Sequence, residues 1–187
     1  MRVRLLAAVL AIAFAPVAAC AADDDNPYKN VKVGDYATYK MITKVAGFDV
    51  AGTMTQSVTK KTDKEATIKI VTNVNNMDLP AQEQTIDLTK PYDPTKAGGL
   101  PPGADVNVEK GKEGKEKIKV GGKEYESTWT TYKVKAKVNG QEINADTKVW
   151  MSKDVPMGMV KMEMTMEVMK MKVEMNMELT ETGNKKQ

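Results

Sequence analysis

Hydrophobic and polar residues alternate with a period of two along almost all of the chain after residue 28. Successive side chains of a β-strand point to opposite faces of a sheet, so this alternation predicts strands with one apolar and one polar face. The expected strands are 34–46, 51–60, 65–75, 82–89, 115–120, 123–138, 141–152, 158–168 and 171–181. The pattern therefore predicts an all-β fold, a single curved antiparallel sheet of about nine strands that forms a half-barrel or open barrel.

Three expected hairpins can be checked by the residues that their registers bring together. Their turns are Gly121-Gly122, Asn139-Gly140 and Met169-Lys170, and Asn-Gly is the strongest short turn signal. In each register opposite charges and apolar residues match together, and a slip of one residue would destroy every match. The matched pairs are Lys119 with Glu124, Lys117 with Glu126, Ile118 with Tyr125, Lys137 with Glu142, Lys133 with Asp146, Trp129 with Trp150, Glu167 with Lys172, Lys161 with Glu178, Met164 with Met175 and Met162 with Met177. Because Met169-Lys170 is a poor turn, a single bulged strand is the alternative there.

Methionine is concentrated in the last of these hairpins. Nine of the fourteen methionines lie between Met157 and Met177, where they alternate with charged and polar residues. Residues two apart on a strand share a face, so the hairpin would present Met and Val on one side and charge on the other. The residues expected on this apolar face, the candidate ligand face, are Met162, Met164, Met166, Met171, Val173, Met175 and Met177.

Three interpretations of the methionine face remain open at this point. Methionine is flexible and fills irregular gaps, so the face can be plain core. Unbranched, polarisable side chains also re-pack around varied ligands, which suits a cavity for lipid or acyl chains. Thioether sulfur binds Cu(I), although the expected β domain offers no Cys or His to strengthen such a site. Trp129 and Trp150 fall on the opposite, charged face, where a cross-strand pair is typical of a structural clasp.

The segment 89–114 interrupts the alternation, because it contains four prolines and five glycines. A loop of this length inside a compact domain is usually functional or disordered. We expect residues 89–108 to form either a lid over one mouth of the sheet or a plain linker. The charge run Glu109–Lys117 is expected to be solvated.

The first twenty residues are typical of a bacterial signal sequence. Met1–Arg4 is basic, Leu5–Ala15 is apolar but too short to span a bilayer, and Pro16 ends it. The run Val17–Cys20 resembles the lipobox of bacterial lipoproteins, in which the Cys becomes diacylated. We therefore expect Cys20 to carry a lipid. The alternative is ordinary cleavage, with Cys20 incidental or removed.

Three absences limit the chemistry that the chain can perform. It has no His, no Arg after Arg4 and no Cys other than Cys20. Ser–His–Asp and Cys–His catalysis, His-ligated zinc and internal disulfides are therefore excluded. The net charge of +3 falls by two when Arg2 and Arg4 are left out, and gives no reason to expect nucleic acid as a partner. We expect a non-enzymatic protein with no catalytic residue, metal site or cofactor.

The run Lys148–Lys161 carries a resemblance to a known group of proteins. A strand containing Trp150 leads into a turn with Asp154 and Pro156, and the next strand opens with Val160 and Lys161. This arrangement is similar to segments of the bacterial periplasmic half-barrel lipoproteins and carriers, the lipoprotein-localisation superfamily. The resemblance implies a strongly curved sheet whose concave apolar face holds acyl chains beneath a lid. It would make the methionine face concave and place 89–108 at the lid, although this chain has no clear lid helices.

We therefore divide the chain into a signal peptide (1–19), a tether (20–30), a single β domain (31–182) and a polar tail (183–187). The expected location is the cell envelope, on the periplasmic side of the outer membrane, because Ala21 after the Cys resembles the outer-membrane sorting pattern. Without acylation the protein would be periplasmic or secreted. The expected function is binding of a lipid or acyl chain on the Met/Val face. The alternatives are a structural or interaction lipoprotein and a periplasmic Cu(I)-binding protein, and the sequence names no protein partner.

Overall fold

The computed structural model describes residues 26–90, 105–138, 141–168 and 171–185, and these residues form strands and turns with no helix among them. The strands are β1 (Asp35–Val45), β2 (Phe48–Lys61), β3 (Glu65–Val74), β4 (Met77–Asp78), β5 (Gln82–Asp87), β6 (Asp105–Val120), β7 (Lys123–Val138), β8 (Gln141–Met151), β9 (Met159–Val168) and β10 (Met171–Asn184). The all-β prediction is confirmed.

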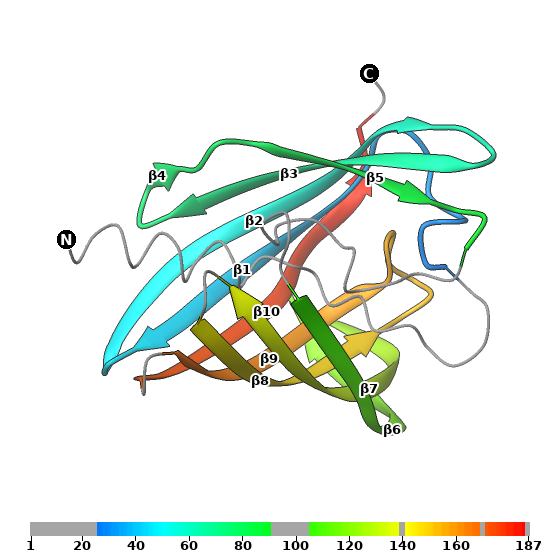
Figure 1. Ribbon diagram of the computed structural model, residues 1–187. Helices are drawn as coiled ribbons and strands as arrows, with labels where there is room; N and C mark the ends of the chain where they lie inside the picture. Colours follow the sequence, from blue (N-terminus) through cyan, green and yellow to red (C-terminus); the bar gives the residue numbers. More distant parts are fainter. Residues whose placement is uncertain (1–25, 91–104, 139–140, 169–170, 186–187) are drawn as a thin grey trace.

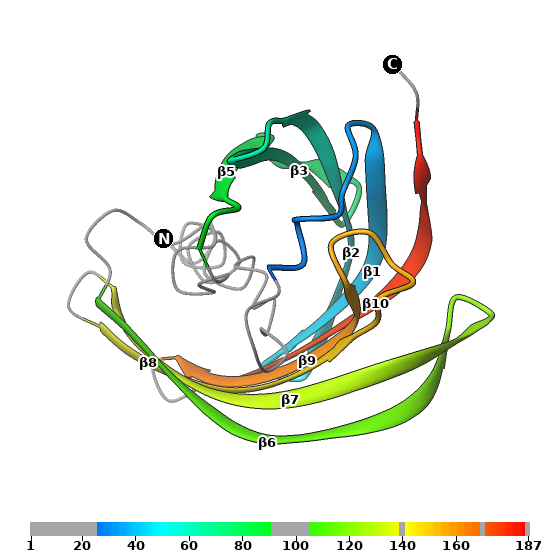
Figure 2. The same cartoon turned by 90° about the vertical axis from the view of Figure 1, so that its right-hand side faces the viewer.

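All strands belong to one antiparallel sheet in the order β4-β3-β2-β1-β10-β9-β8-β7-β6, and β5 pairs with β3 beside β4. At the centre of the sheet the first long strand, β1, pairs with the last, β10. Figures 1 and 2 show that the sheet curves strongly around one side without closing into a barrel. The predicted curved, open antiparallel sheet is therefore confirmed.

The three hairpin registers are also confirmed. Lys119 lies opposite Glu124 in β6–β7, and Trp129 lies opposite Trp150 in β7–β8. Met164 lies opposite Met175 between two separate strands, so the bulged single strand is wrong. Gly121 and Gly122 have φ of 57° and 79°, the mirror-image turn whose twist matches that of the strands. The other two turns, 139–140 and 169–170, lie outside the described residues.

The structure corrects the expectation for residues 89–114. Strand β6 begins at Asp105, so the expected strand 115–120 is only its end. The charge run Glu109–Lys117 is part of this strand, which forms one edge of the sheet, and charged side chains on an edge hinder pairing with another sheet. Two glycines and a bulge between Lys110 and Glu113 hide the alternation here. Residues 91–104 of the expected lid lie outside the described residues.

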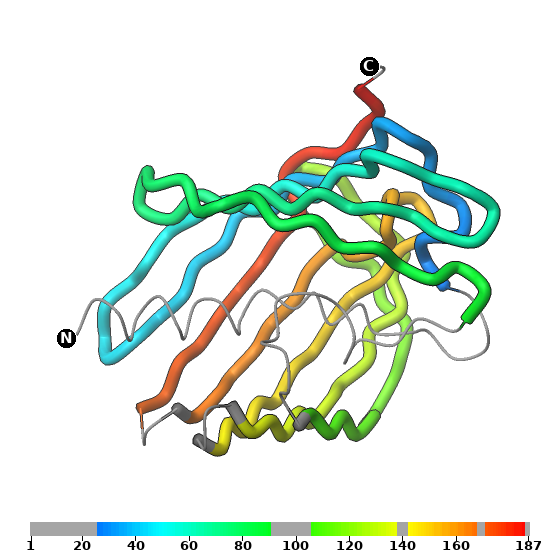
Figure 3. Tube along the Cα trace, turned by 45° about the horizontal axis from the view of Figure 1, so that its top comes forward, coloured from blue at the N-terminus to red at the C-terminus, as the bar shows by residue number. Residues whose placement is uncertain are grey.

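The two ends of the sheet differ in what they carry. The turns 46–47 and 75–76 lie at the same end as the starts of β8 and β10, as the registers and Figure 3 show. The segment 26–34 lies at the other end, where Lys61 Nζ donates to the carbonyls of Lys29 (2.6 Å) and Val31 (2.7 Å). Tyr28 within it is 2% exposed. The fold therefore includes residues 26–30, which the sequence analysis assigned to the tether.

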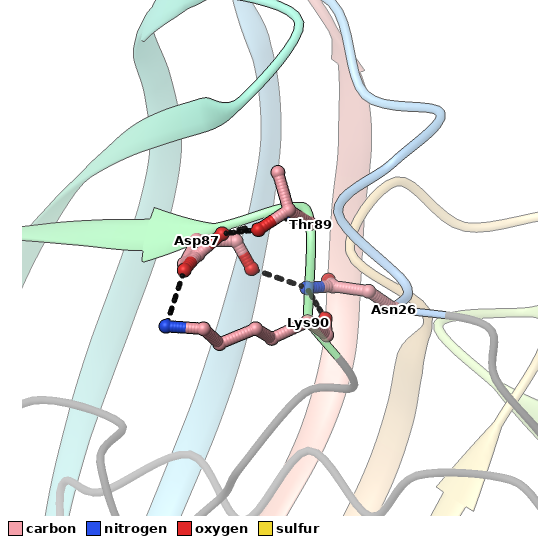
Figure 4. A network of polar contacts seen from close by, with 4 residues as sticks. All are labelled: Asn26, Asp87, Thr89 and Lys90. Carbon is pink, nitrogen blue, oxygen red and sulfur yellow. Dashed lines mark hydrogen bonds and ion pairs between the residues drawn. The ribbon is translucent and has the colours of Figure 1, made fainter.

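A polar network joins this segment to the end of β5 (Figure 4). Asn26 Nδ2 donates to the carbonyls of Asp87 (3.1 Å) and Lys90 (3.2 Å). Asp87 Oδ1 accepts from the backbone N–H and the hydroxyl of Thr89, and the Lys90 ammonium lies 3.0 Å from its Oδ2. The hydrogen bonds from Thr89, with the Lys90 charge, lower the pKa of Asp87 to about 2. The network fixes where the chain enters the sheet.

Candidate functional site

The candidate site is the concave face of the sheet. Inward residues of the long strands form one apolar cluster with residues of the segment 26–34 and of the loop 152–158, and both segments lie on the concave side in Figure 2. Alternation places most of the apolar side chains of the long strands on this side, and the curvature turns them toward one another. One surface therefore collects the apolar side chains of strands far apart in the chain.

The structure brings six of the seven predicted ligand-face residues together on this surface. Their exposed fractions are 0% for Met162, 1% for Met177, 1% for Val173, 2% for Met166, 3% for Met175 and 7% for Met164. Met171, the seventh, is 40% exposed, because it begins β10 at the end of the sheet. Cys20, the predicted lipid-attachment residue, lies outside the described residues.

The methionine rows continue onto the strands at either side of the hairpin. Met162 lies between Met177 of β10 and Val149 of β8. Met177 in turn lies opposite Met41 of β1. Cross-strand neighbours are about 5 Å apart, so this row forms an unbroken apolar band over four strands. Sequence reasoning identified the hairpin but missed Met41, because the β1–β10 pairing joins the two ends of the chain.

A buried tyrosine supports the face from β1. Tyr39 is 0% exposed, and its hydroxyl donates to the carbonyl of Met159 at 3.1 Å. Burial, with a smaller contribution from Tyr28, raises the pKa of Tyr39 far above its ordinary value. The hydroxyl therefore stays protonated and serves as a hydrogen-bond donor that joins β1 to the start of β9.

The opposite face is charged and carries the predicted tryptophan clasp. Lys161 lies 2.9 Å from Glu163 and 3.5 Å from Glu178. The Lys148 ammonium lies 4.3 Å from the ring centres of both Trp129 and Trp150, a favourable cation–π arrangement.

The clasp also includes a hydrogen bond across to the edge strand. The Trp150 indole N–H donates to Glu116 of β6, and Trp150 is only 5% exposed. Sequence reasoning missed Lys148, although its spacing of two from Trp150 on one strand face was the available signal. The clasp ties β6 and β7 to β8 on the side away from the methionines.

The charged face also has a shallow cleft of about 560 Å³. Its lining includes both signs of charge, with Lys133 opposite Asp146 and Lys148 opposite Glu163. Neighbouring opposite charges leave little net field to attract an ion. Within the described ranges no group of three or more His, Cys, Asp or Glu side chains could hold a metal ion. Nor does that part of the chain contain a helix long and apolar enough to cross a membrane.

Two solved structures share this fold over most of the chain. One is a Bacteroides fragilis protein, inferred to be exported and described as having a YmcC-like fold; it aligns with a TM-score of 0.53 and 10% identity, covering 82% of this chain and 97% of that one. The other is an inferred lipoprotein of Parabacteroides distasonis, with a TM-score of 0.52, 10% identity, and coverage of 86% of this chain and 100% of that one. No family model and no curated protein matches the sequence. At these identities the comparison establishes the fold alone.

Proposed function

We propose that this chain is an exported, non-enzymatic envelope protein, anchored by a lipid on Cys20, that binds a lipid or acyl chain on its Met/Val face. The observation that carries the proposal is the continuous apolar face of an open sheet. A sheet must bury its apolar face against a second layer. The described part of the chain supplies neither a helix nor a second sheet for this purpose. An apolar ligand supplies such a layer.

The leader supports export and anchoring. A basic start, a short apolar stretch and a lone cysteine after small residues form a recognisable export signal. The two proteins of the same fold are themselves inferred to be an exported protein and a lipoprotein. The short polar stretch between Cys20 and Asn26 is suited to a tether, and Asn26 is where the described fold begins.

The choice of methionine supports binding of a ligand rather than closure by a fixed layer. Met41, Met162, Met164, Met175 and Met177 occupy the middle of the face. Val or Ile would suit a strand better, because Met is a weak strand former. Met side chains have three rotatable bonds and re-pack around an incoming apolar group.

The low exposure of these methionines favours a second candidate function. Six predicted ligand-face residues are between 0% and 7% exposed, as expected for plain core. In that case the protein is a structural or interaction lipoprotein, and the charged face with its tryptophan clasp is the surface that contacts a partner.

Native mass spectrometry of protein purified from its own envelope separates these candidates. Ligand binding predicts added masses that match lipids or acyl compounds. A Met164→Gln variant should lose these masses, while the matched Met171→Gln variant at the exposed end of β10 should keep them. A bare polypeptide mass would refute ligand binding and leave the core role, and an added mass of copper would support the Cu(I) alternative.

The anchor is tested by labelling cells with a palmitate analogue. We expect the label on the wild-type protein and none on a Cys20→Ala variant, which should also leave the membrane fraction. Equal membrane retention of both proteins, without label, would reject the lipid anchor but leave the ligand proposal standing.

A further inference from the structure

Two buried polar side chains on the concave face have an atom without a hydrogen-bond partner. Among the described residues these atoms are Gln56 Nε2 and Thr147 Oγ1, and their residues are 2% and 3% exposed. A third such atom, Asn176 Oδ1, belongs to a residue that alternates with the buried methionines and so lies on the charged face. Buried polar groups are nearly always paired, so each exception requires a physical explanation.

Gln56 is set among apolar neighbours of the candidate ligand face. It lies between Met54 and Val58 along the inward side of β2. Its cross-strand neighbours are Ala37 of β1 and Ile70 of β3. Ala37 is 0% exposed, and neither an alanine nor an isoleucine side chain can form a hydrogen bond with the glutamine amide. A leucine or methionine at position 56 would fit the pattern of this strand and would leave no donor unpaired.

The chemistry of the buried face limits what the free amide can bind. The buried polar residues of the described chain are Asn26, Thr43, Gln56, Thr72, Ser127, Thr130, Thr147 and Ser152. None of them carries a charge. A carboxylate or phosphate brought to this face would lack a cation, which is strongly unfavourable in an apolar environment. A neutral carbonyl oxygen accepts a hydrogen bond without this penalty.

We propose that the concave face selects acyl esters or amides over free fatty acids, with the Gln56 side-chain N–H donating to the carbonyl of the ligand. This inference rests on the proposed function and names the class of ligand that the same face takes. In this arrangement the methionine band contacts the acyl chain, and the Gln56 amide donates a hydrogen bond to the uncharged ester or amide carbonyl. An unbranched chain is long enough to run from β2 toward the methionine rows of β10 and β9.

Thr147 provides a matched control for this assignment. Its hydroxyl is also buried and unpaired, and it lies on the same face between Tyr132 and Met164. Four strand spacings separate β8 from β2, about 19 Å along the curve of the sheet, so the two residues belong to different parts of the concave face. The hydroxyl oxygen is held close to the backbone of β8, whereas the glutamine amide extends from its strand on a longer stem.

The test compares binding of monopalmitoylglycerol and of palmitate to the purified, delipidated mature protein. We expect the wild type to bind the ester about ten-fold more tightly, the effect of one hydrogen bond made and one charge avoided. Gln56→Met, which preserves side-chain length, should reduce this preference to less than about three-fold. Thr147→Val should preserve it. Thermal unfolding shows whether each variant is folded, and Gln56→Leu serves as a second variant if Gln56→Met fails to fold.

The outcomes are distinguishable. An unchanged ester preference in folded Gln56→Met protein would overturn the assignment of Gln56. Equal binding of ester and acid by the wild type would overturn the selectivity while leaving an apolar-ligand function in place. Absence of binding to either compound would reject the proposed function together with this inference.

Discussion

The tryptophan clasp makes a sharp prediction about a glycine on the edge strand. Gly114 of β6 lies directly opposite Trp129 of β7. A Cβ atom added at Gly114 would lie 2.7 Å from Trp129 Cζ2, 2.8 Å from Cε2 and 3.0 Å from Nε1. Real Cβ atoms do not approach this closely, so a Gly114→Ala variant must displace an indole that also contacts Lys148.

The expected net cost of Gly114→Ala is about 1–2 kcal/mol in the free energy of unfolding. Overpacking typically costs about 1–3 kcal/mol, and a partly exposed cation–π contact contributes about 0.5–1 kcal/mol. Replacing glycine by alanine also lowers the conformational entropy of the unfolded chain, which stabilises the folded state by about 0.4–1 kcal/mol. For a domain of this size the balance corresponds to a fall in Tm of about 3–6 °C.

The assay is thermal and urea unfolding followed by far-UV circular dichroism, arranged as a double-mutant cycle with Trp129→Leu. With the indole absent, Gly114→Ala should be neutral or stabilising by up to about 1 kcal/mol. The neighbouring exposed substitution Lys115→Ala should change stability by less than about 0.5 kcal/mol in either background. Equal destabilisation by Gly114→Ala with and without Trp129 would show that the indole is not the cause.

Three further predictions concern the core and the polar network around Asp87 at the end of β5. Met162→Ala, at a fully buried position, should cost about 2–5 kcal/mol of unfolding free energy, whereas Met171→Ala should cost less than about 1 kcal/mol; similar losses in urea unfolding would contradict the assigned faces. Tyr39→Phe should cost about 0.5–1.5 kcal/mol by removing the buried hydrogen bond to the Met159 carbonyl, and an unchanged urea midpoint would show that this hydrogen bond does not contribute to stability. The pKa of Asp87 is lowered to about 2, so its contribution to stability is complete above its ordinary value of 3.8 and is lost as the pH falls through about 2. The Tm of the wild type should therefore fall more than that of Asp87→Asn between pH 3.8 and about 2. An equal fall in the Tm of both proteins would contradict the lowered pKa of Asp87.

Hairpins were the most predictable part of the fold because both partners lie close together in the chain. In β9–β10 the pairs Glu167–Lys172 and Met164–Met175 match charge and apolarity in one register only. The same local information failed at β6, where glycines and a bulge obscure the alternation. The alternation of apolar and polar residues cannot be recognised where glycines supply no side chain or where a bulge shifts the register.

Part of the candidate site was predictable for the same reason. The alternation assigned Met162 and Met177 to one face, and both are buried there. The contribution of Met41 and Gln56 was not predictable, because β1 and β2 reach the methionine hairpin only through the pairing of β1 with β10. That contact joins residues more than a hundred positions apart, and no local pattern encodes it.

The sequence by itself determined most of the strands, three hairpin registers and the division of most strands into an apolar and a charged face, because these depend on neighbours within one hairpin. Only the tertiary structure decided that the ends of the chain pair at the centre of the sheet and that the methionines share a buried surface with Gln56. The pairing of β1 with β10, like the curvature, arises from the twist and packing of all ten strands together. The residues of a single hairpin do not encode it.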